Sequence, residues 1–342
     1  MATELDVLIV FSRQVMHIRT LELFCSIVEH RSFSRAAISH SVTQSAASQA
    51  VSQLESVLGI RLVDRSKRPL VLTPSGEIYF SGLIKLLRGL RRLEQDVKAL
   101  NGRLEGMVSV AAIYSLGSTY MPIAREIFRR TNPHIEVTMD YGSSDAVARL
   151  VEHGEADLGL VSYPKSSRKL RFIPWLDEQM HFVASKNHEL SKRTQFRLTD
   201  AIGSEFVGFE SGLKIRKAID SFLSKRGVFV NVTMEFDNID SIIRAVQANE
   251  AITILPVSTV RKECADGSLR VLSCDEVTLS RPLGIILPRS GGSSRVIESF
   301  VSMLTDRQYF KSDDRDSSFQ HHNELSGCMS FSTEYKSRSR KC

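Results

Sequence analysis

The chain has 342 residues, of which 42% are hydrophobic and 25% are charged, and its formal net charge is +6. This length accommodates two or three domains with buried cores, and the composition excludes a fibrous or wholly disordered protein. The modest excess of basic residues fits a nucleic-acid partner but does not by itself indicate one.

The sequence argues against a membrane or secreted protein. The apolar run 5–11 has no basic residue before it and no small-residue cleavage site after it, and no stretch reaches a membrane-spanning length. The five cysteines are scattered, without the spacing of a metal site or a redox pair. We therefore expect a cytoplasmic protein with no membrane partner, no metal site and no cofactor, whose cysteines are idle thiols.

Both ends of the chain are predicted to be appendages. Helical periodicity begins just after Met16, so residues 1–15 form an N-terminal extension, and either Met1 or Met16 can be the natural start. Residues 307–342 form a C-terminal tail, most of which is rich in Ser, Lys, Arg and Asp without an apolar period. This composition predicts disorder.

Three short helices are predicted between these ends, within residues 16–74. In the first, apolar residues at i, i+3, i+4 and i+7 share one face: Leu21, Phe24, Cys25 and Val28. Ser32 offers an N-cap oxygen for a second helix at 35–40. Thr43 can cap a third helix that runs to about Leu58, where Gly59 is a natural stop.

The third predicted helix has an apolar and a polar face. Its apolar stripe consists of Ala47, Val51, Leu54 and Leu58. The other side carries Gln44, Ser45, Ser48, Gln49 and Ser52. Such short uncharged side chains let a helix enter a major groove, where Gln can bond an adenine edge and the N-terminal residues reach the bases. A polar surface without DNA is the alternative, although a solvated face usually carries Glu and Lys.

A basic hairpin is predicted directly after this helix. Its strands lie at 61–64 and 70–72, with Pro69 at the turn. The cations around it are Arg61, Arg65, Lys67 and Arg68. Beside a recognition helix, such a hairpin is a wing whose cations hold phosphates. A solvated basic loop is the alternative.

Several motifs in this region resemble those of LysR-type transcriptional regulators, in the same order and spacing. The matching runs are Leu21–Phe24, Ser32–Ala37, Gln44–Gln49, Gln53–Gly59, Leu62–Arg65 and Leu72–Gly76. The resemblance implies that Gln44, Ser45 and Ser48 contact bases and that Arg65 contacts phosphate. We assign the DNA interface to Arg35, Thr43, Gln44, Ser45, Ser48, Gln49, Ser52, Arg65 and Arg68. Two positions depart from the family: Gln49 stands where Arg is common, and Val63 where Phe is common.

One long helix is predicted over residues 75–105. Its apolar residues are spaced three and four apart: Leu83, Leu86, Leu90, Leu93, Val97, Leu100 and Leu104. This heptad seam predicts pairing with a second chain, as linker helices do in the LysR family, and packing on its own domain is the alternative. The predicted assembly is a homodimer or homotetramer. Two linked heads would read a double-stranded DNA operator with approximate two-fold symmetry.

An α/β effector-binding domain is predicted over residues 106–306. Strands at 108–113, 135–141 and 156–162 alternate with helices, which predicts a parallel sheet with right-handed crossovers. Ligands of such sheets bind beyond the carboxyl ends of the strands, near helix N-termini. Ser115 and Ser143–Ser144 follow two of these strands, so we expect a small polar or anionic effector there. Each serine alone can be a plain N-cap.

The resemblance completes this domain as two lobes, similar to periplasmic binding proteins. Lobe I is expected at about 106–176 and 283–306, and lobe II at about 177–282, with the last strand and helix returning to lobe I. The effector contacts carried over are Ser115, Ser143, Ser144, Glu210 and Ser211. Asn249-Glu250-Ala251 replaces the Gly-rich turn that is common before the Pro-ended strand.

The predicted function is a sequence-specific DNA-binding transcriptional regulator controlled by an effector between two α/β lobes. No nucleophile elbow, zinc-protease helix or phosphate-binding loop occurs, so we expect no catalysis. The alternative is a small-molecule-binding protein whose N-terminal helices serve only oligomerisation. The effector, the direction of regulation and the target genes are not predicted.

Overall fold

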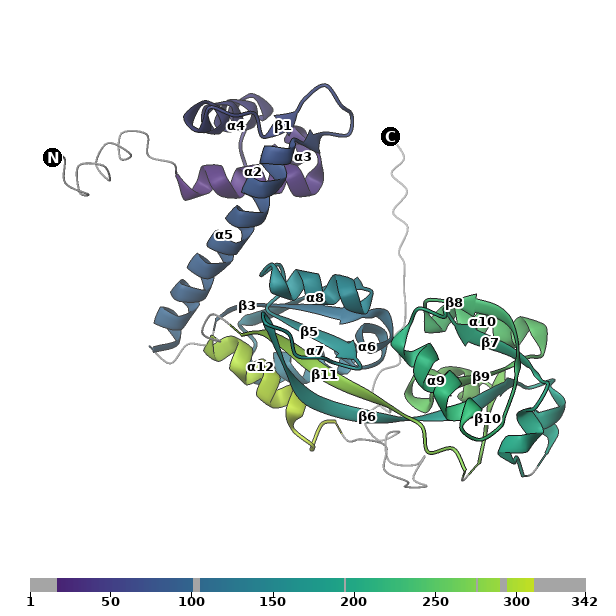
Figure 1. Cartoon of the computed structure of the whole chain (residues 1–342). Coiled ribbons are helices and arrows are strands. Elements are labelled where there is room, and N and C mark those ends of the chain that lie inside the picture. The colour runs from purple at the N-terminus through teal and green to yellow at the C-terminus, as the bar shows by residue number, and fades with distance from the viewer. Residues whose placement is uncertain (1–16, 101–104, 194, 275, 290–293, 311–342) are drawn as a thin grey trace, which may run out of the picture.

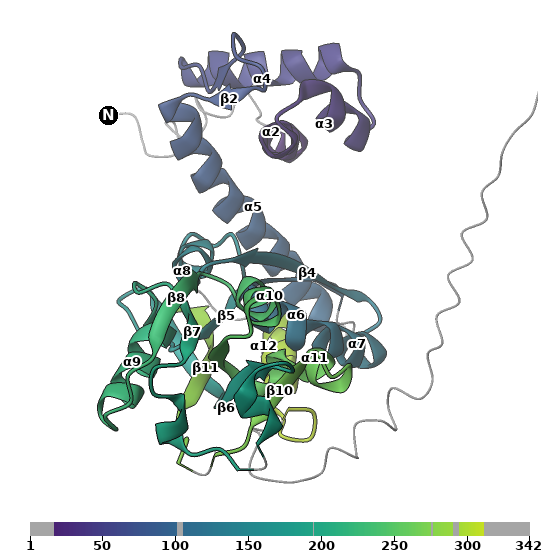
Figure 2. The ribbon, with the colours of Figure 1, turned by 90° about the vertical axis from the view of Figure 1, so that its right-hand side faces the viewer.

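The computed structural model describes residues 17–100, 105–193, 195–274, 276–289 and 294–310. The predicted extension 1–15, most of the predicted tail and Leu104 of the seam lie outside them. Figures 1 and 2 show a small N-terminal head that one long helix separates from two α/β lobes. The predicted fold class is therefore confirmed.

The head contains three helices and a two-stranded hairpin. They are α2 (Ile18–His30), α3 (Phe33–Ser39), α4 (Gln44–Leu58), β1 (Val63–Asp64) and β2 (Val71–Leu72). Their apolar faces form one core around Phe24. The strands are shorter than predicted, because only two residue pairs form the antiparallel ladder.

The linker helix α5 (Pro74–Leu100) leaves the head directly after β2. Leu83 and Leu87 on this helix are buried in the core of the head. The prediction that Leu83 belongs to the seam between two chains is therefore wrong. Helical periodicity marks an apolar face but does not say which surface covers it.

Lobe I is an α/β sandwich. Its sheet contains β3 (Gly106–Ile113), β4 (Ile135–Gly142), β5 (Leu158–Ser162), β11 (Ser280–Pro288) and the first part of β6 (Leu170–Ser185). As predicted, β3 lies parallel to both β4 and β5. One face is covered by α6 (Tyr114–Thr119), α7 (Met121–Thr131) and α12 (Arg295–Thr305), and the other by α8 (Ser144–Glu152).

Lobe II has its own core around a continuation of the same sheet. Its strands are the second part of β6, β7 (Glu205–Phe209), β8 (Asn231–Phe236), β9 (Ile252–Pro256) and β10 (Leu269–Leu272). Its helices are α9 (Lys214–Ser224), α10 (Ile239–Asn249) and α11 (Arg261–Ala265), with short 3-10 turns η1 (Glu189–Lys192), η2 (Leu198–Ala201) and η3 (Val257–Thr259).

Two adjacent strands, β6 and β11, carry the chain between the lobes. On β6, Leu176 packs in lobe I and Met180 in lobe II. On β11, Leu283 packs in lobe I. The two strands are antiparallel neighbours throughout this crossing, so the lobes are joined by a two-stranded ribbon.

One residue of the segment after α12 packs on lobe I. Phe310 is buried in its core, and its ring makes edge contacts with Tyr120 and Trp175. The prediction that the disordered tail starts at residue 307 is therefore wrong for residues 307–310. A single aromatic residue after a helix gives no periodic signal, although it buries a large apolar area.

Candidate functional sites

Helix α4 is fixed at both ends and presents a polar face. Thr43 Oγ1 accepts a hydrogen bond from Ala46 N at 3.2 Å, and Gly59 ends the helix with φ 67°. The stripe Ala47, Val51 and Leu54 is buried in the head. On the other side, Gln44, Ser45, Gln49 and Ser52 are exposed and Ser48 is half-buried.

The wing arginine Arg65 lies across this polar face. Its Nη1 donates to Ser48 Oγ at 3.0 Å and its Nη2 to Ser52 Oγ at 2.9 Å. The guanidinium carbon also lies 5.3 Å from the ring centroid of Phe33. The structure thus brings together three of the predicted DNA-contacting residues, one of them a predicted phosphate contact and two on the helix face.

Glu55 holds the wing beside α4 and was not predicted as a functional residue. Its Oε1 accepts hydrogen bonds from Leu62 N at 2.8 Å and Val63 N at 3.0 Å. Its Oε2 lies 3.5 Å from Arg65 Nη2. The two remaining predicted cations, Arg35 and Arg68, are exposed and lie outside this network of contacts.

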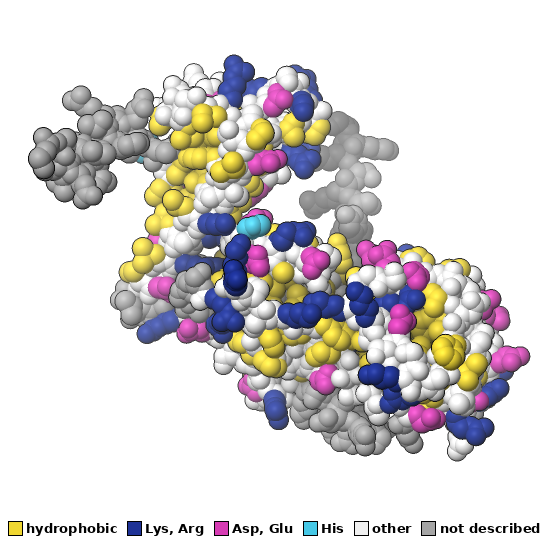
Figure 3. Space-filling view, in the orientation of Figure 1, with side chains coloured by type: hydrophobic (Ala, Val, Ile, Leu, Met, Phe, Trp, Pro, Cys, Tyr) yellow, Lys and Arg dark blue, Asp and Glu magenta, His cyan; other side chains and the backbone are white. Residues whose placement is uncertain are grey.

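An apolar stripe on α5 faces solvent in the single chain. Its members are Ile78, Leu86, Leu93 and Val97, each more than half exposed. Gly82 and Gly89 lie between them along the helix, and nothing else lies within 4 Å of the space that a Cβ would occupy at either position. Hydrophobic side chains run along α5 in Figure 3. So large an exposed apolar surface is typical of a protein–protein contact.

Further along, α5 is attached to lobe I by two arginines. Arg88 Nη1 donates to the Gly154 carbonyl at 2.7 Å, and Arg92 binds Asp157 Oδ1 through Nε at 3.1 Å and Nη2 at 2.5 Å. The other Asp157 oxygen accepts from Ser109 N at 2.8 Å. A cavity of about 610 Å³ lies beside these contacts, between α5 and lobe I.

The predicted effector serines of lobe I lie at the carboxyl edge of its parallel strands. Ser143 Oγ accepts a hydrogen bond from Ala146 N and caps α8, in which Ser144 is the first residue. Ser115 lies inside α6 and does not act as an N-cap; its Oγ accepts from Arg281 Nη1 at 3.2 Å. Because β3 and β4 are parallel neighbours, the helices that follow them begin at the same edge.

The predicted effector residues of lobe II lie where the lobes meet. Glu210 and Ser211 are exposed in the turn between β7 and α9. Lys214, at the start of α9, donates through Nζ to the carbonyl of Tyr163 at 3.1 Å, just after β5 of lobe I. This contact places the turn beside the carboxyl edge of the lobe I sheet.

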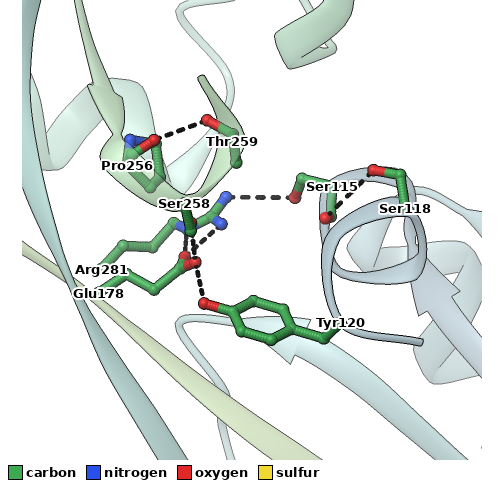
Figure 4. Close-up of polar contacts among 8 residues, drawn as sticks. All are labelled: Ser115, Ser118, Tyr120, Glu178, Pro256, Ser258, Thr259 and Arg281. Carbon is green, nitrogen blue, oxygen red and sulfur yellow. Dashed lines mark hydrogen bonds and ion pairs between the residues drawn. The ribbon is translucent and has the colours of Figure 1, made fainter. Parts of the chain in front are cut away.

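Several polar residues between the lobes were missed by the sequence analysis. Arg281 and Glu178 form a buried ion pair, which also binds Tyr120 and Ser258 (Figure 4). Burial and the neighbouring Glu178 carboxylate raise the pKa of Tyr120 far above its usual value. Tyr163 has a buried hydroxyl with no hydrogen-bond partner among the described residues, and burial raises its pKa to about 12.

Known families match both parts of the chain. The model described as the LysR substrate binding domain matches residues 101–308, and the model described as the bacterial regulatory helix-turn-helix protein of the lysR family matches residues 18–77. The chain belongs to the LysR family of transcriptional regulators. It is therefore a DNA-binding transcriptional regulator with an effector-binding domain and not an enzyme, as the sequence predicted, and the alternative of a head that serves only oligomerisation is discarded.

Individual relatives and solved structures resemble this chain over more than half of its length. The HTH-type transcriptional activator CmpR of Synechocystis sp. is 26% identical over 283 residues, which cover 83% of this chain and 93% of the relative. The structure of full-length CbnR complexed with its target DNA has a TM-score of 0.64 at 17% identity and covers 86% of this chain and 100% of that one. The CcmR regulatory domain of Synechocystis in complex with 2-PG has a TM-score of 0.53 at 23% identity, covering 59% and 96%.

Other classes of site were sought in the described part of the chain. No helix there is long and apolar enough to cross a membrane. Residues 17–310, apart from the gaps given above, contain no group of three or more His, Cys, Asp or Glu side chains that could hold a metal ion. Burial raises the pKa of the Cys25 thiol to about 12, so it stays protonated at neutral pH.

Proposed function

We propose that this LysR-family regulator reads its operator with the uncharged face of α4 and binds it mainly through the cations of the wing. Gln44, Ser45 and Ser48 contact base edges, and Arg65 and Arg68 contact phosphates. The observation that carries the proposal is the network that joins Arg65 to Ser48 and Ser52. In this network a guanidinium lies beside the short hydroxyl side chains of α4, and the Glu55 carboxylate is 3.5 Å from it at the far end of that face.

Arg65 exchanges its partners when DNA binds. Hydroxyls are weaker acceptors for a guanidinium than a phosphate oxygen is. Arg65 therefore leaves the two serines for the backbone of the operator, and their hydroxyls become available to the bases. Arg35, Thr43, Gln49 and Ser52 complete the proposed interface.

A gel shift on the DNA upstream of its own gene tests this assignment. Gln44→Ala lowers the preference for the operator over a scrambled duplex by about tenfold, the loss of one base contact. Arg65→Ala weakens binding to both duplexes and reduces the slope of log K against log salt by about one. Gln53→Ala, an exposed glutamine later in α4, is the matched control. Parental binding by both Gln44→Ala and Arg65→Ala means that the interface lies elsewhere.

We further propose that two chains pair through the exposed stripe of α5, so that the cytoplasmic protein is a homodimer or a pair of dimers. Ile78, Leu86 and Leu93 supply large exposed apolar side chains of the stripe, and Gly82 and Gly89 between them allow a close helix approach. Two heads held in this way fit an operator with approximate two-fold symmetry.

The proposed effector is small and polar or anionic, and it binds where Ser115, Ser143 and Ser144 of lobe I approach Glu210 and Ser211 of lobe II. Support comes from the placement of the serines at the carboxyl edge of parallel strands, where donors converge. A thermal-shift series with 2-PG, inorganic phosphate and sulfate tests the class of ligand. Ser115→Ala should abolish any stabilisation, whereas Ser118→Ala should keep it. Equal stabilisation in both variants places the ligand elsewhere.

A further inference from the structure

A charged pair is buried on the ribbon that joins the two lobes. Arg281 of β11 lies directly opposite Glu178 of β6 in the antiparallel ladder. Their side chains are only 2% and 3% exposed, and both Nε and Nη2 of Arg281 donate to Glu178 Oε2, the former at 2.7 Å. Such a pair is strongly destabilising to separate, because each charge would remain buried without its partner.

This pair is also hydrogen-bonded to both lobes. Tyr120 of lobe I donates its hydroxyl to Glu178 Oε1 at 2.6 Å, and Ser258 of lobe II donates to the same oxygen at 2.5 Å. On the other side, Arg281 Nη1 donates to Ser115 Oγ of lobe I. Figure 4 shows the pair between the turn that carries Ser258 and the helix that carries Ser115.

The hydrogen bonds of this pair have two consequences, one for the angle between the lobes and one for the Ser115 hydroxyl. A buried carboxylate that loses one donor keeps its desolvation cost without the compensating bond, so rotation of the lobes away from each other is resisted. A guanidinium only donates hydrogen bonds, so Ser115 Oγ must accept from it. The Ser115 proton therefore points away from Arg281 and remains available to an acceptor group.

We infer that Glu178 and Arg281 form an inter-lobe latch that fixes the angle between the lobes and orients the Ser115 hydroxyl toward an acceptor on the effector. The latch rests on the proposed effector site at Ser115. Arg281 acts there as a positioning residue. An effector that engages Ser115 changes the hydrogen bond to Arg281, and the change reaches Ser258 in lobe II through Glu178.

Single hydroxyl deletions test the latch without removing either buried charge. Tyr120→Phe removes one of its two hydrogen bonds to lobe I and leaves the one at Ser115, and Ser258→Ala removes its hydrogen bond to lobe II. The readout is hydrogen exchange of the full-length protein at two amides on or against the ribbon, here called the ribbon amides. Met180 N on β6 donates to the Leu279 carbonyl, and Tyr163 N, just after β5, donates to the Pro282 carbonyl on β11. Each variant should speed exchange at both amides by about fivefold, the factor for one ordinary hydrogen bond.

Two neighbouring hydroxyls provide matched controls. Within the described part of the chain, Ser118 Oγ donates only to the Ser115 carbonyl and Thr259 Oγ1 only to the Pro256 carbonyl, so Ser118→Ala and Thr259→Val should leave ribbon exchange unchanged. Ser258→Thr retains a hydroxyl and should restore the parental rate. The double variant with Tyr120→Phe and Ser258→Ala should show less than the product of the single effects, because both act on one oxygen.

The latch is refuted if both single deletions leave ribbon exchange at the parental rate, or if each speeds exchange only within its own lobe. This measurement requires neither DNA nor effector, so it is independent of the proposed function. If the unmutated protein binds the operator and a scrambled duplex equally well in the gel shift, the proposed function is refuted, but the hydrogen-exchange result is unaffected. Arg281→Lys keeps the charge next to Glu178 but replaces the three separate nitrogens that reach Glu178 and Ser115 with a single one on a shorter side chain. It should therefore weaken any thermal stabilisation by 2-PG as strongly as Ser115→Ala does, and parental stabilisation in this variant contradicts the positioning role.

Discussion

Replacing Asp157 with alanine tests how α5 is attached to the effector domain. The Asp157 carboxylate serves two donors of different kinds, the Arg92 guanidinium and the backbone N–H of Ser109. Ser109 is nearly buried, so Asp157→Ala leaves its N–H without an acceptor, at a cost of about 1–3 kcal/mol. Arg92 is 26% exposed, and solvent screening limits its ion pair to about 1 kcal/mol. The free energy of unfolding of the effector domain should therefore fall by about 2–4 kcal/mol.

Urea unfolding followed by the fluorescence of Trp175 measures this change. Trp175 is the only tryptophan of the chain, and its Nε1 donates to the Leu304 carbonyl inside lobe I. Two further variants separate the contributions. Arg92→Met removes the ion pair alone and should cost about 1 kcal/mol. Asp157→Asn keeps an oxygen for Ser109 N and should cost less than Asp157→Ala. If Asp157→Asn and Asp157→Ala are equally destabilising, the backbone N–H is not the dominant contribution and the reasoning fails.

Three further predictions concern other parts of the chain. Leu93→Asp should lower the mass measured by sedimentation to that of a smaller assembly, because it places a charge in the exposed stripe of α5. Asp96→Ala, at another exposed position of α5, should keep the parental mass, and a parental mass for Leu93→Asp contradicts pairing through this face. Glu250→Gly should raise the free energy of unfolding in urea by about 0.5–1 kcal/mol, because Glu250 ends α10 with φ 48°, a left-handed conformation that glycine adopts without strain. A lower free energy of unfolding would show that the Glu250 side chain stabilises the fold by more than this backbone strain costs. Burial lowers the pKa of His188 below 6.5 in the folded protein, so the unfolded chain binds the proton first as the pH falls, and the free energy of unfolding should decrease from about pH 7 downward. His188→Asn keeps an acceptor for Leu190 N and should reduce the difference between the free energies of unfolding measured in urea at pH 7.5 and pH 5.5; an unchanged difference would refute the role of His188.

Local periodicity was sufficient to predict the head and most of lobe I. The apolar stripe of α4 and the cap at Thr43 depend on neighbours within a few residues, and both are present. The β-α-β-α-β rhythm likewise predicted the parallel order of β3, β4 and β5. In contrast, no strand was predicted where β6 crosses between the lobes, because Pro174 and Asp177 interrupt its apolar pattern there.

The contacts that join distant segments were beyond local patterns. Glu178 and Arg281 are charged, and charged residues are expected on the surface unless a partner is known. Their partners lie on segments that only the folded sheet brings together, and the same holds for Arg92 with Asp157. The prediction that Leu83 lies between two chains was wrong for a related reason, because the head of the same chain covers this side chain.

The ribbon between the lobes also has a consequence for engineering. Asp177 and Pro282 face each other in the β6–β11 register, so the chain enters and leaves lobe II at neighbouring points. Lobe II is thus an inserted module whose two ends are already adjacent, the geometry in which domain insertion is best tolerated. A lobe II taken from another LysR-family protein could be grafted between these two positions with only two junctions to design. The half of the proposed effector site that lies on lobe II is then exchanged while lobe I, the DNA-binding head and its operator stay the same.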